Sequence, residues 1–576
     1  MKANSDKSKQ SNKATRRVLA GVLCGASVLS LVLSLVMPPI SQAIANDAQT
    51  EETVTGGGSS SESTGVDNTN NGDTENQNSG DAEGDETGSS NSDEQAQAED
   101  QLEGELQVED GDSSNNGAVM AAAEGGQTET APDAINSVDE LKNKLTHASG
   151  AASFKLAADI ETSETITLNK DDSNITLDLN GCKIKHKSQN LPLFNITGGA
   201  TLTVMDSQQA EVDNPTDSKY VCSDNTLSKN GNLASVAYDK TSKIPTKLTY
   251  YVTGSSVNPD GTSTTETLYK HEVGIGGAIV ACDGGDGLRF INLYTTDGKS
   301  GTFTLKSGVI TQQENGKVSS LVYAENGSSV NMNGGYVCGA SGSGAGGGIE
   351  VRNNSNLSIS GGVIAGNSAP SGGGVYVNGS AVTVTDGVIS GNSTLANTPG
   401  FGGGIMGEGG SVTVSGGFIT NNRYANFCGE DGSGNHGGAG LAAKNGTHVT
   451  ISGGQITGNY SEEAGGGVYV TDQGRSGSRK DMAWLNITGG IIASNVSYRS
   501  EGAGIRVGQM VDAMISGTPD SNDTPGSKVY ITNNHCMSRF DWGGGGVFVQ
   551  GDSNTASNAG RLFVYNSYIS SNTAGG

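Results

Sequence analysis

A two-part pattern recurs along the C-terminal half of the chain. Three small residues followed by Ile, Val or Leu open seven copies, at Gly346, Gly372, Gly402, Gly438, Gly465, Gly502 and Gly544. Each copy is followed by an Ile, two residues and an Asn, which gives the series Asn367, Asn392, Asn422, Asn459, Asn495, Asn534 and Asn572. A pattern repeated at this spacing predicts a repeat architecture, in which each copy is one structural unit.

Each unit holds three short strand patterns, such as Val375–Val377, Val382–Val384 and Val388–Ser390. Side chains of a strand alternate between its two faces, so one side of each strand is apolar. A unit this small cannot enclose a core, but stacked units can, with strands of successive units paired in parallel. The sequence therefore predicts an all-β fold, a parallel β-helix with three faces per coil. The content of 89 glycines and 5% aromatic residues suits such a fold.

The repeated residues have structural interpretations. Glycines permit sharp turns and close approach of neighbouring coils. The asparagines are expected to stack at one corner as a ladder, hydrogen bonded to one another and to turn backbone. The triplets lack the Gly-Lys-Ser/Thr ending of a phosphate loop and precede strands instead of helices.

The N-terminal region has a different composition. Residues 1–45 combine a cationic start, an apolar run and Ala43-Ile44-Ala45, and are interpreted as a signal peptide, with an uncleaved membrane anchor as the alternative. Residues 46–132 are acidic, of low complexity and poor in apolar residues, and are expected to be disordered. Residues 131–576 are mildly acidic and carry −10 of the net charge of −27, and no basic patch points to nucleic acid.

The β-helix is expected to span 133–576. Ser137–Glu140 matches a capping box, and Val138, Leu141 and Leu145 share one helical face, which predicts a short helix that covers the N-terminal end of the core. Residues 207–273 interrupt the repeats and are expected to form a protruding hairpin or subdomain. Residues 424–436, 471–482 and 509–526 are shorter excursions. Because the chain stops where the next triplet is due, truncation within a repeat is expected, with any cap or anchor beyond Gly576.

The repeats resemble the GGA[ILV] and FxxN repeats of polymorphic outer-membrane proteins and similar bacterial surface adhesins. Phe418-Ile419-Thr420-Asn421 matches the FxxN form itself. The wider resemblance is to right-handed β-helix proteins of the pectin-lyase-like superfamily. It implies a right-handed coil and an exported, bacterial cell-surface protein. Most copies of this chain have Ile where the family has Phe.

Candidate binding residues come from the positions that point outward after each triplet. The first outward column runs Glu350, Tyr376, Met406, Ala442, Tyr469, Arg506 and Phe548, and the second includes Arg352, Glu408 and Lys444. Exposed rings at Tyr376, Tyr469 and Phe548 are expected to stack on sugars or dock a partner. A solvated sheet with incidental cross-strand pairs is the alternative.

No catalytic constellation is found in the sequence. His436 has no Asp/His pairing motif around it, and the Asp/His/Arg set of galacturonide hydrolases is missing. No metal site or cofactor is predicted. Six cysteines follow the signal segment, and an exported protein can pair them: Cys182, Cys222, Cys282, Cys338, Cys428 and Cys536.

The expected function is therefore a non-catalytic adhesin-like stalk that binds glycans or components of host or bacterial surfaces. A polysaccharide lyase or glycoside hydrolase is the first alternative, and a spacer that presents a further C-terminal domain is the second. Contact with a membrane is expected only through the signal segment or a C-terminal anchor.

Overall fold

The computed structural model of the chain describes residues 132–209, 215–219, 233–258, 264–282, 284–395, 400–426, 436–521, 526–538 and 543–575. The expected signal peptide and almost all of the acidic segment lie outside these ranges, as do Cys222 and Cys428. No helix in the described ranges is long and apolar enough to cross a membrane.

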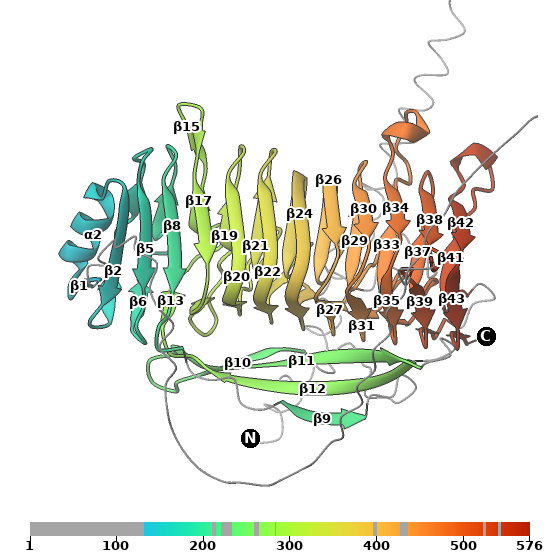
Figure 1. The fold of residues 1–576 in the computed structure, drawn as a ribbon, viewed down its shortest axis with the longest axis horizontal. Coiled ribbons are helices and arrows are strands. Elements are labelled where there is room, and N and C mark those ends of the chain that lie inside the picture. The colour runs from blue at the N-terminus through green and yellow to red at the C-terminus, as the bar shows by residue number, and fades with distance from the viewer. Residues whose placement is uncertain are drawn as a thin grey trace, which may run out of the picture. The chain divides into compact units, whose positions relative to one another are not determined.

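Successive coils stack in parallel along the whole described chain (Figure 1). The middle face lies between the other two faces in chain order, and each coil supplies one of its strands to a continuous parallel sheet. These strands are β2 (Ala151–Leu156), β5 (Asn174–Asp178), β8 (Thr201–Met205), β17 (Thr302–Leu305), β20 (Ser329–Cys338), β22 (Asn356–Ala365), β24 (Val375–Ser390), β26 (Ile405–Val414), β30 (His448–Ile451), β34 (Trp484–Ile487), β38 (Asp512–Ser516) and β42 (Arg561–Tyr565). The prediction of an all-β solenoid with parallel strands is confirmed.

Two further faces complete the coil. The triplet face follows the glycine triplets and contains β7 (Phe194–Ile196), β14 (Arg289–Leu293), β19 (Ser320–Ala324), β21 (Ile349–Arg352), the first residues of β24 and β26, β29 (Leu441–Lys444), β33 (Val468–Val470), β37 (Ile505–Val507) and β41 (Val547–Val549). The ladder face precedes the asparagines and contains β13 (Ala278–Ala281), β18 (Val309–Gln312), the ends of β20, β22 and β24, β27 (Phe418–Thr420), β31 (Gln455–Thr457), β35 (Gly490–Ala493), β39 (Val529–Thr532) and β43 (Ser567–Ser570).

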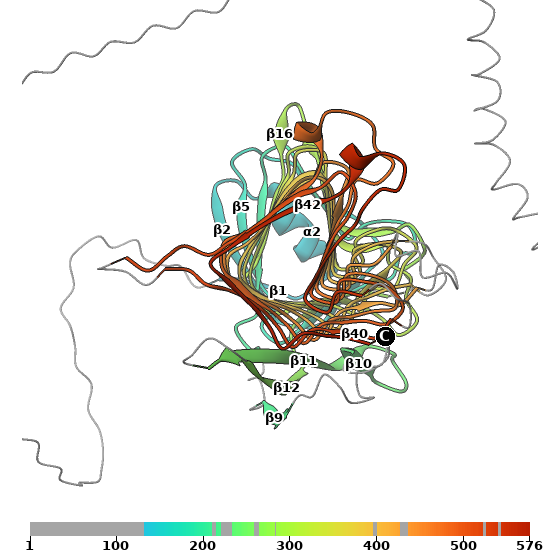
Figure 2. The ribbon, with the colours of Figure 1, turned by 90° about the vertical axis from the view of Figure 1, so that its right-hand side faces the viewer.

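Three faces do not account for every strand. After each asparagine a two-residue strand joins a separate parallel sheet, from β23 (Ser368–Ala369) and β25 (Ser393–Thr394) to β40 (His535–Cys536) and β44 (Thr573–Ala574). The sequence missed this sheet because two residues are too few to show an alternating pattern. Viewed along the solenoid, these segments form a lobe beside the main tube (Figure 2).

The core lies inside the tube and is built from aliphatic residues in register. In β24, Val375, Val377, Val382, Val384 and Ile389 are all buried and belong to one continuous cluster. Their neighbours in the coils on either side are aliphatic as well, except for Gly407 beside Val377. Full burial of a Val or Ile side chain contributes about 1.5–3 kcal/mol, so each coil stabilises the next.

Helix α2 (Val138–His147) lies at the N-terminal end of the tube (Figure 1). The hydroxyl of Ser137 accepts from the backbone N–H of Glu140, and the Glu140 carboxylate accepts from the N–H of Asn136 at 2.7 Å. Leu141 and Leu145 are buried and join the core cluster. The predicted short helix is therefore present, with its apolar face against the coil interior.

The asparagines of the repeat form a continuous ladder at one corner. Nδ2 of Asn392 donates to Oδ1 of Asn422 at 3.0 Å and to the carbonyl of Ile364 at 2.9 Å. Oδ1 of Asn392 accepts both from the backbone N–H and from Nδ2 of Asn367. The same pattern continues through Asn459, Asn495, Asn534 and Asn572. The buried amides thus satisfy turn backbone that water cannot reach.

The FxxN match lies one residue out of this frame. Phe418 is on the outer side of the ladder face, where it packs against the cluster outside the tube, and Asn421 adopts a φ of 54°. Ile419 faces inward, and Asn422 enters the ladder. The repeat therefore runs from Ile419 to Asn422 in this coil.

The insertion is an antiparallel sheet of β9 (Thr216–Lys219), β10 (Ser235–Tyr238), β11 (Pro245–Val257) and β12 (Thr264–Gly274). The expectation that it protrudes is wrong, because the sheet lies along the ladder face (Figures 1 and 2). Leu248, Tyr250 and Val252 pack on the outward residues Val309 and Tyr336. The ladder face is apolar on its outer side in these coils, and the inserted sheet covers it.

Disulfide pairing is not seen among the described cysteines. Cys182, Cys338 and Cys536 are free thiols. Burial raises the pKa of Cys338 to about 12. The expectation of pairing is wrong for these three residues, and Cys338 packs as a small apolar residue under the inserted sheet.

Candidate functional site

The outward residues of the triplet face stack in the predicted register. Parallel pairing places one residue of each coil beside the next, in the order Glu350, Tyr376, Met406, Ala442, Tyr469, Arg506 and Phe548. The second column runs in the same way through Arg352, Asn378, Glu408 and Lys444. The first column, that of Glu350, extends in the N-terminal direction through Tyr323, Asn292 and Asn195.

The expected exposure of the first column is wrong. Tyr376 is 6% exposed and Tyr469 is fully buried, while Phe548 is half-buried. The chain leading into each triplet folds back beside the strand that follows. A Cβ on Gly372 would lie 2.9 Å from Cβ of Tyr376, and Tyr376, Met406 and Ala442 form a cluster with Phe401. The rings of this column therefore hold the lobe to the tube and offer little surface to a ligand.

The charged candidates form one connected network. Arg352 pairs with Glu350, whose other oxygen accepts from Ser320 Oγ at 2.6 Å. The Arg352 guanidinium lies 5.1 Å from the ring centre of Tyr376, and the Tyr376 hydroxyl donates to Glu408 at 2.6 Å. Lys444 lies 3.5 Å from the other oxygen of Glu408. Each of the two carboxylates is thus compensated on both oxygens.

Burial, followed by the hydrogen bond to Glu408, raises the pKa of Tyr376 to about 12. The phenol therefore stays protonated at neutral pH and acts as a donor to Glu408. Burial and then the charge of Lys444 lower the pKa of His436, whose ring packs on Phe401 at 5.3 Å. A neutral, ring-packed His436 fits a structural role.

Arg506 is the most enclosed charge of the column. Its guanidinium lies 5.0 Å from the ring centre of Tyr469 and 5.7 Å from that of Phe548, in the coils before and after it. Glu501 pairs with it at 3.4 Å, and both side chains are almost completely buried. This arrangement fixes the lobe against the tube in the last coils.

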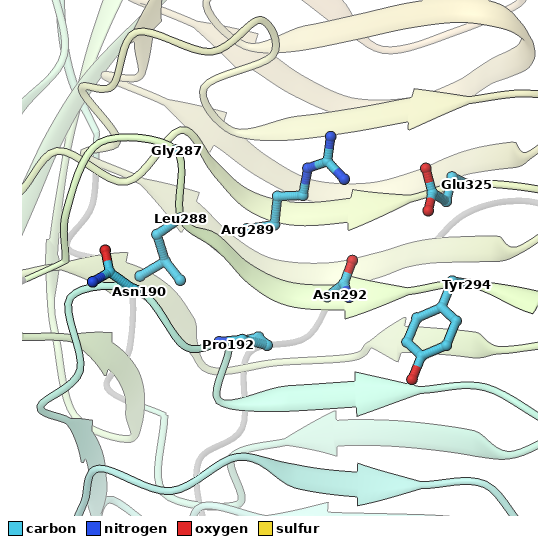
Figure 3. Close-up of a pocket in the computed structure, with 8 residues that line it drawn as sticks. All are labelled: Asn190, Pro192, Gly287, Leu288, Arg289, Asn292, Tyr294 and Glu325. Carbon is cyan, nitrogen blue, oxygen red and sulfur yellow. The ribbon is translucent and has the colours of Figure 1, made fainter.

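An open groove lies at the N-terminal part of the triplet face, before the glycine repeats begin. The Arg289 groove has a volume of about 390 Å³ and is lined by Asn190, Pro192, Gly287, Leu288, Arg289, Asn292, Tyr294 and Glu325 (Figure 3). Strand β14 supplies Arg289 and Asn292, Tyr294 follows that strand, and Glu325 follows β19. The first of the seven glycine triplets, at Gly346, follows these coils in the sequence.

The polar groups of the Arg289 groove are set in position by their neighbours. The Arg289 guanidinium lies 3.6 Å from the ring centre of Tyr323, and the Tyr323 hydroxyl donates to Glu325 at 2.7 Å. Asn292 donates from Nδ2 to Asn195 at 2.9 Å, which leaves its carbonyl oxygen as an acceptor. Arg289 is exposed and has no ion pair in the described part of the chain. Donors, acceptors and the Tyr294 ring thus converge on one concave surface.

The sequence interpretation did not single out these residues. Glu325 and Tyr294 belong to the same outward column as Arg352, one and two coils earlier respectively, since Ala324 pairs with Val351 and Leu293 with Ala324. Extending the register back from Arg352 finds them. The glycine triplets that define the register are missing in those coils, so the repeat pattern does not indicate Tyr294 and Glu325.

The described residues contain no group of three or more His, Cys, Asp or Glu side chains that could hold a metal ion. Comparisons of the chain with protein-family models, with curated proteins and with solved structures found no match in any of the three.

Proposed function

We propose that the chain is an exported bacterial surface protein that binds glycans in the Arg289 groove without cleaving them. The parallel solenoid serves as a rigid, adhesin-like stalk, and the groove replaces the buried Tyr376 and Tyr469 as the contact surface. The proposal includes a right-handed coil of the pectin-lyase-like type, since connections between parallel strands of one sheet are right-handed in nearly all proteins. Export rests on the cationic and apolar segment at the N-terminus.

One observation supports glycan binding above the others. The Arg289 groove combines a guanidinium without an ion pair among the described residues, an amide oxygen, a carboxylate and an aromatic ring on a rigid sheet. Sugars offer hydroxyl groups that need both donors and acceptors, and an apolar ring face that stacks on aromatic side chains. Arg289 and Glu325 balance each other in charge, so the groove suits a neutral glycan.

The alternative of a lyase or hydrolase is less well supported on this face. Such an enzyme needs a carboxylate or a base that can exchange a proton with the substrate. Glu350 and Glu408 are each compensated by a cation and a hydroxyl or amide donor. A group held in this way orients neighbouring residues instead of reacting.

The proposal is tested by a glycan array followed by calorimetric titration of the best neutral ligand with the full chain. Arg289→Gln and Tyr294→Ala should each weaken binding by about tenfold or more, because a hydrogen bond from a charged donor contributes about 1.5–3 kcal/mol. Lys306→Gln, which removes an exposed cation from the middle face, is the matched control and should bind as the natural chain does. Unchanged binding by both groove variants would remove the groove as the site.

A further inference from the structure

A second groove lies on the middle face, near the C-terminal end of the described solenoid. Its floor comes from β34, β38 and β42, and its wall is the 3₁₀ turn η1 (Arg479–Asp481). The volume is about 430 Å³, and the side chains that matter below are Arg479, Lys480, Trp484, Asn486, Met514 and Phe563. We call it the Trp484 groove. The wall belongs to the excursion from the repeat spacing at 471–482.

The chemistry of the middle face changes at this groove. In earlier coils the outward position in register is a short polar residue, namely Thr203, Thr304, Asn331, Ser358, Thr383, Thr413 and Thr450. The next positions are Asn486, Met514 and Phe563. Met514 is 39% exposed and Phe563 is 55% exposed. A local run of large apolar side chains on an otherwise polar face indicates a contact surface.

The groove also carries excess positive charge. Asp512 is the one carboxylate among its lining residues, and it is held by Arg479 at 2.9 Å and by Nε of Arg561 at 2.6 Å. The hydrogen bond from Arg561, together with the charge of Arg479, lowers the pKa of Asp512, so it remains ionised and paired. Lys480 is exposed and has no ion pair in the described ranges. Asp481 of the same turn does not line the groove. An anionic ligand is therefore favoured.

The backbone of the groove floor favours a sugar over a peptide. Strand β38 pairs with β34 on one side and β42 on the other, so its N–H and C=O groups are already used. A bound peptide strand therefore finds no unpaired backbone on β38, which removes from this strand the usual source of affinity for extended peptides. The half-buried Trp484 ring, held at a tilt against the His448 ring with 4.9 Å between ring centres, instead offers a fixed platform for the apolar face of a sugar.

We propose that the Trp484 groove binds an anionic polysaccharide, through Trp484 and Phe563 against the sugar rings and through Lys480 and Arg479 to its carboxylate or sulfate groups. This site is separate from the Arg289 groove, which is balanced in charge and lies on the triplet face. The two sites therefore differ in the class of glycan that they take. A chain with both can hold two kinds of polymer at once.

The test measures binding of the full chain to polygalacturonate, dextran sulfate, neutral dextran and poly-glutamate by calorimetry. At least one of the two acidic polysaccharides should bind, with affinity that falls as salt rises, and neutral dextran should not bind at this groove. Lys480→Gln should weaken that binding about tenfold, because one charge-assisted contact is lost. Trp484→Ala should weaken it by a similar factor.

Three controls keep the result specific. Tyr568→Ala removes an exposed ring from the ladder face and Lys306→Gln removes an exposed cation, and both should bind as the natural chain does. Arg289→Gln should also leave binding of the acidic polysaccharide unchanged. This control distinguishes binding at the Trp484 groove from binding at the Arg289 groove. Lys480 is exposed, so its variant reports on binding even if Trp484→Ala fails to fold.

Several outcomes would overturn the proposal. They are a failure of both acidic polysaccharides to bind, equal binding of neutral dextran that Lys480→Gln also weakens, and binding of an acidic polysaccharide that Lys480→Gln does not change. Equal binding of poly-glutamate that is insensitive to Trp484→Ala would show a charged surface without a sugar site.

Discussion

The side-chain amide of Asn392 lies directly against Gly374, the third glycine of the triplet in the same coil. A Cβ on Gly374 would stand 2.9 Å from Nδ2 of Asn392 and 2.8 Å from the carbonyl oxygen of Gly404 in the next coil. The same contact joins Gly348 with Asn367 and Gly467 with Asn495. The two parts of the repeat are therefore one structural device, because the glycine leaves the room that the ladder amide occupies.

Replacement of Gly374 by alanine should destabilise the solenoid by about 1–3 kcal/mol, since the added methyl group overlaps backbone that cannot move freely. Gly551→Ala is the control, because a Cβ there meets nothing within 4 Å, and it should change stability by less than about 0.5 kcal/mol. Denaturant unfolding of the two variants checks this. Equal stability would show that the triplet glycine is not set by the ladder.

Loss of one ladder amide should cost more than loss of an amide on the sheet surface. Asn422→Ala removes the acceptor of the Asn392 backbone N–H and one of the two acceptors of Asn392 Nδ2, and it removes the side-chain donor to the carbonyl of Ile389. Each unsatisfied buried group costs about 1–3 kcal/mol. Asn331→Ala, which removes one long hydrogen bond to Thr304 on the middle face, should cost well under 1 kcal/mol. Thermal melting of the two variants measures these costs. A similar loss of stability in both would contradict the claim that the asparagine ladder stabilises the solenoid.

The stability of the chain should fall as pH rises from about 10 towards 12. The phenol of Tyr376 has a folded-state pKa of about 12, above its ordinary value of 10, because of burial and the bond to Glu408. Above the unfolded pKa the unfolded chain releases this proton and the folded chain retains it, so its contribution is lost over that window. Tyr376→Phe should be less stable at neutral pH, with the difference narrowing as pH rises. Parallel curves of melting temperature against pH would exclude this contribution.

The inserted sheet should contribute to the stability of the coils beneath it. Leu248→Ala removes a buried side chain from the cluster with Val309 and Tyr336, and should destabilise by about 2–5 kcal/mol. The exposed substitution Ser256→Ala on the same strand should have little effect. Hydrogen exchange of β18 and β20 is the direct measurement. Unchanged protection of these strands in Leu248→Ala would mean that the sheet packs on the tube without stabilising it.

The repeat spacing was sufficient to predict the coils, the parallel register and the stacking order of Glu350, Tyr376 and Tyr469. It could not predict their burial, because the lobe that covers them consists of two-residue strands and connecting turns without a periodic signal. The Arg289 groove was not predicted either, because it lies in coils that lack the glycine triplets. The path of the insertion was also beyond prediction, although the apolar outward residues Val280, Val309 and Val363 marked a face in need of cover.

The central claim, that the chain binds glycans without cleaving them, is tested most directly by the size of a polysaccharide before and after incubation with it. The polysaccharide is a neutral one that calorimetry shows to bind. The account predicts binding that is lost in Arg289→Gln together with an unchanged chain length after long incubation. Shortening of the polysaccharide that disappears in Glu408→Ala would contradict it.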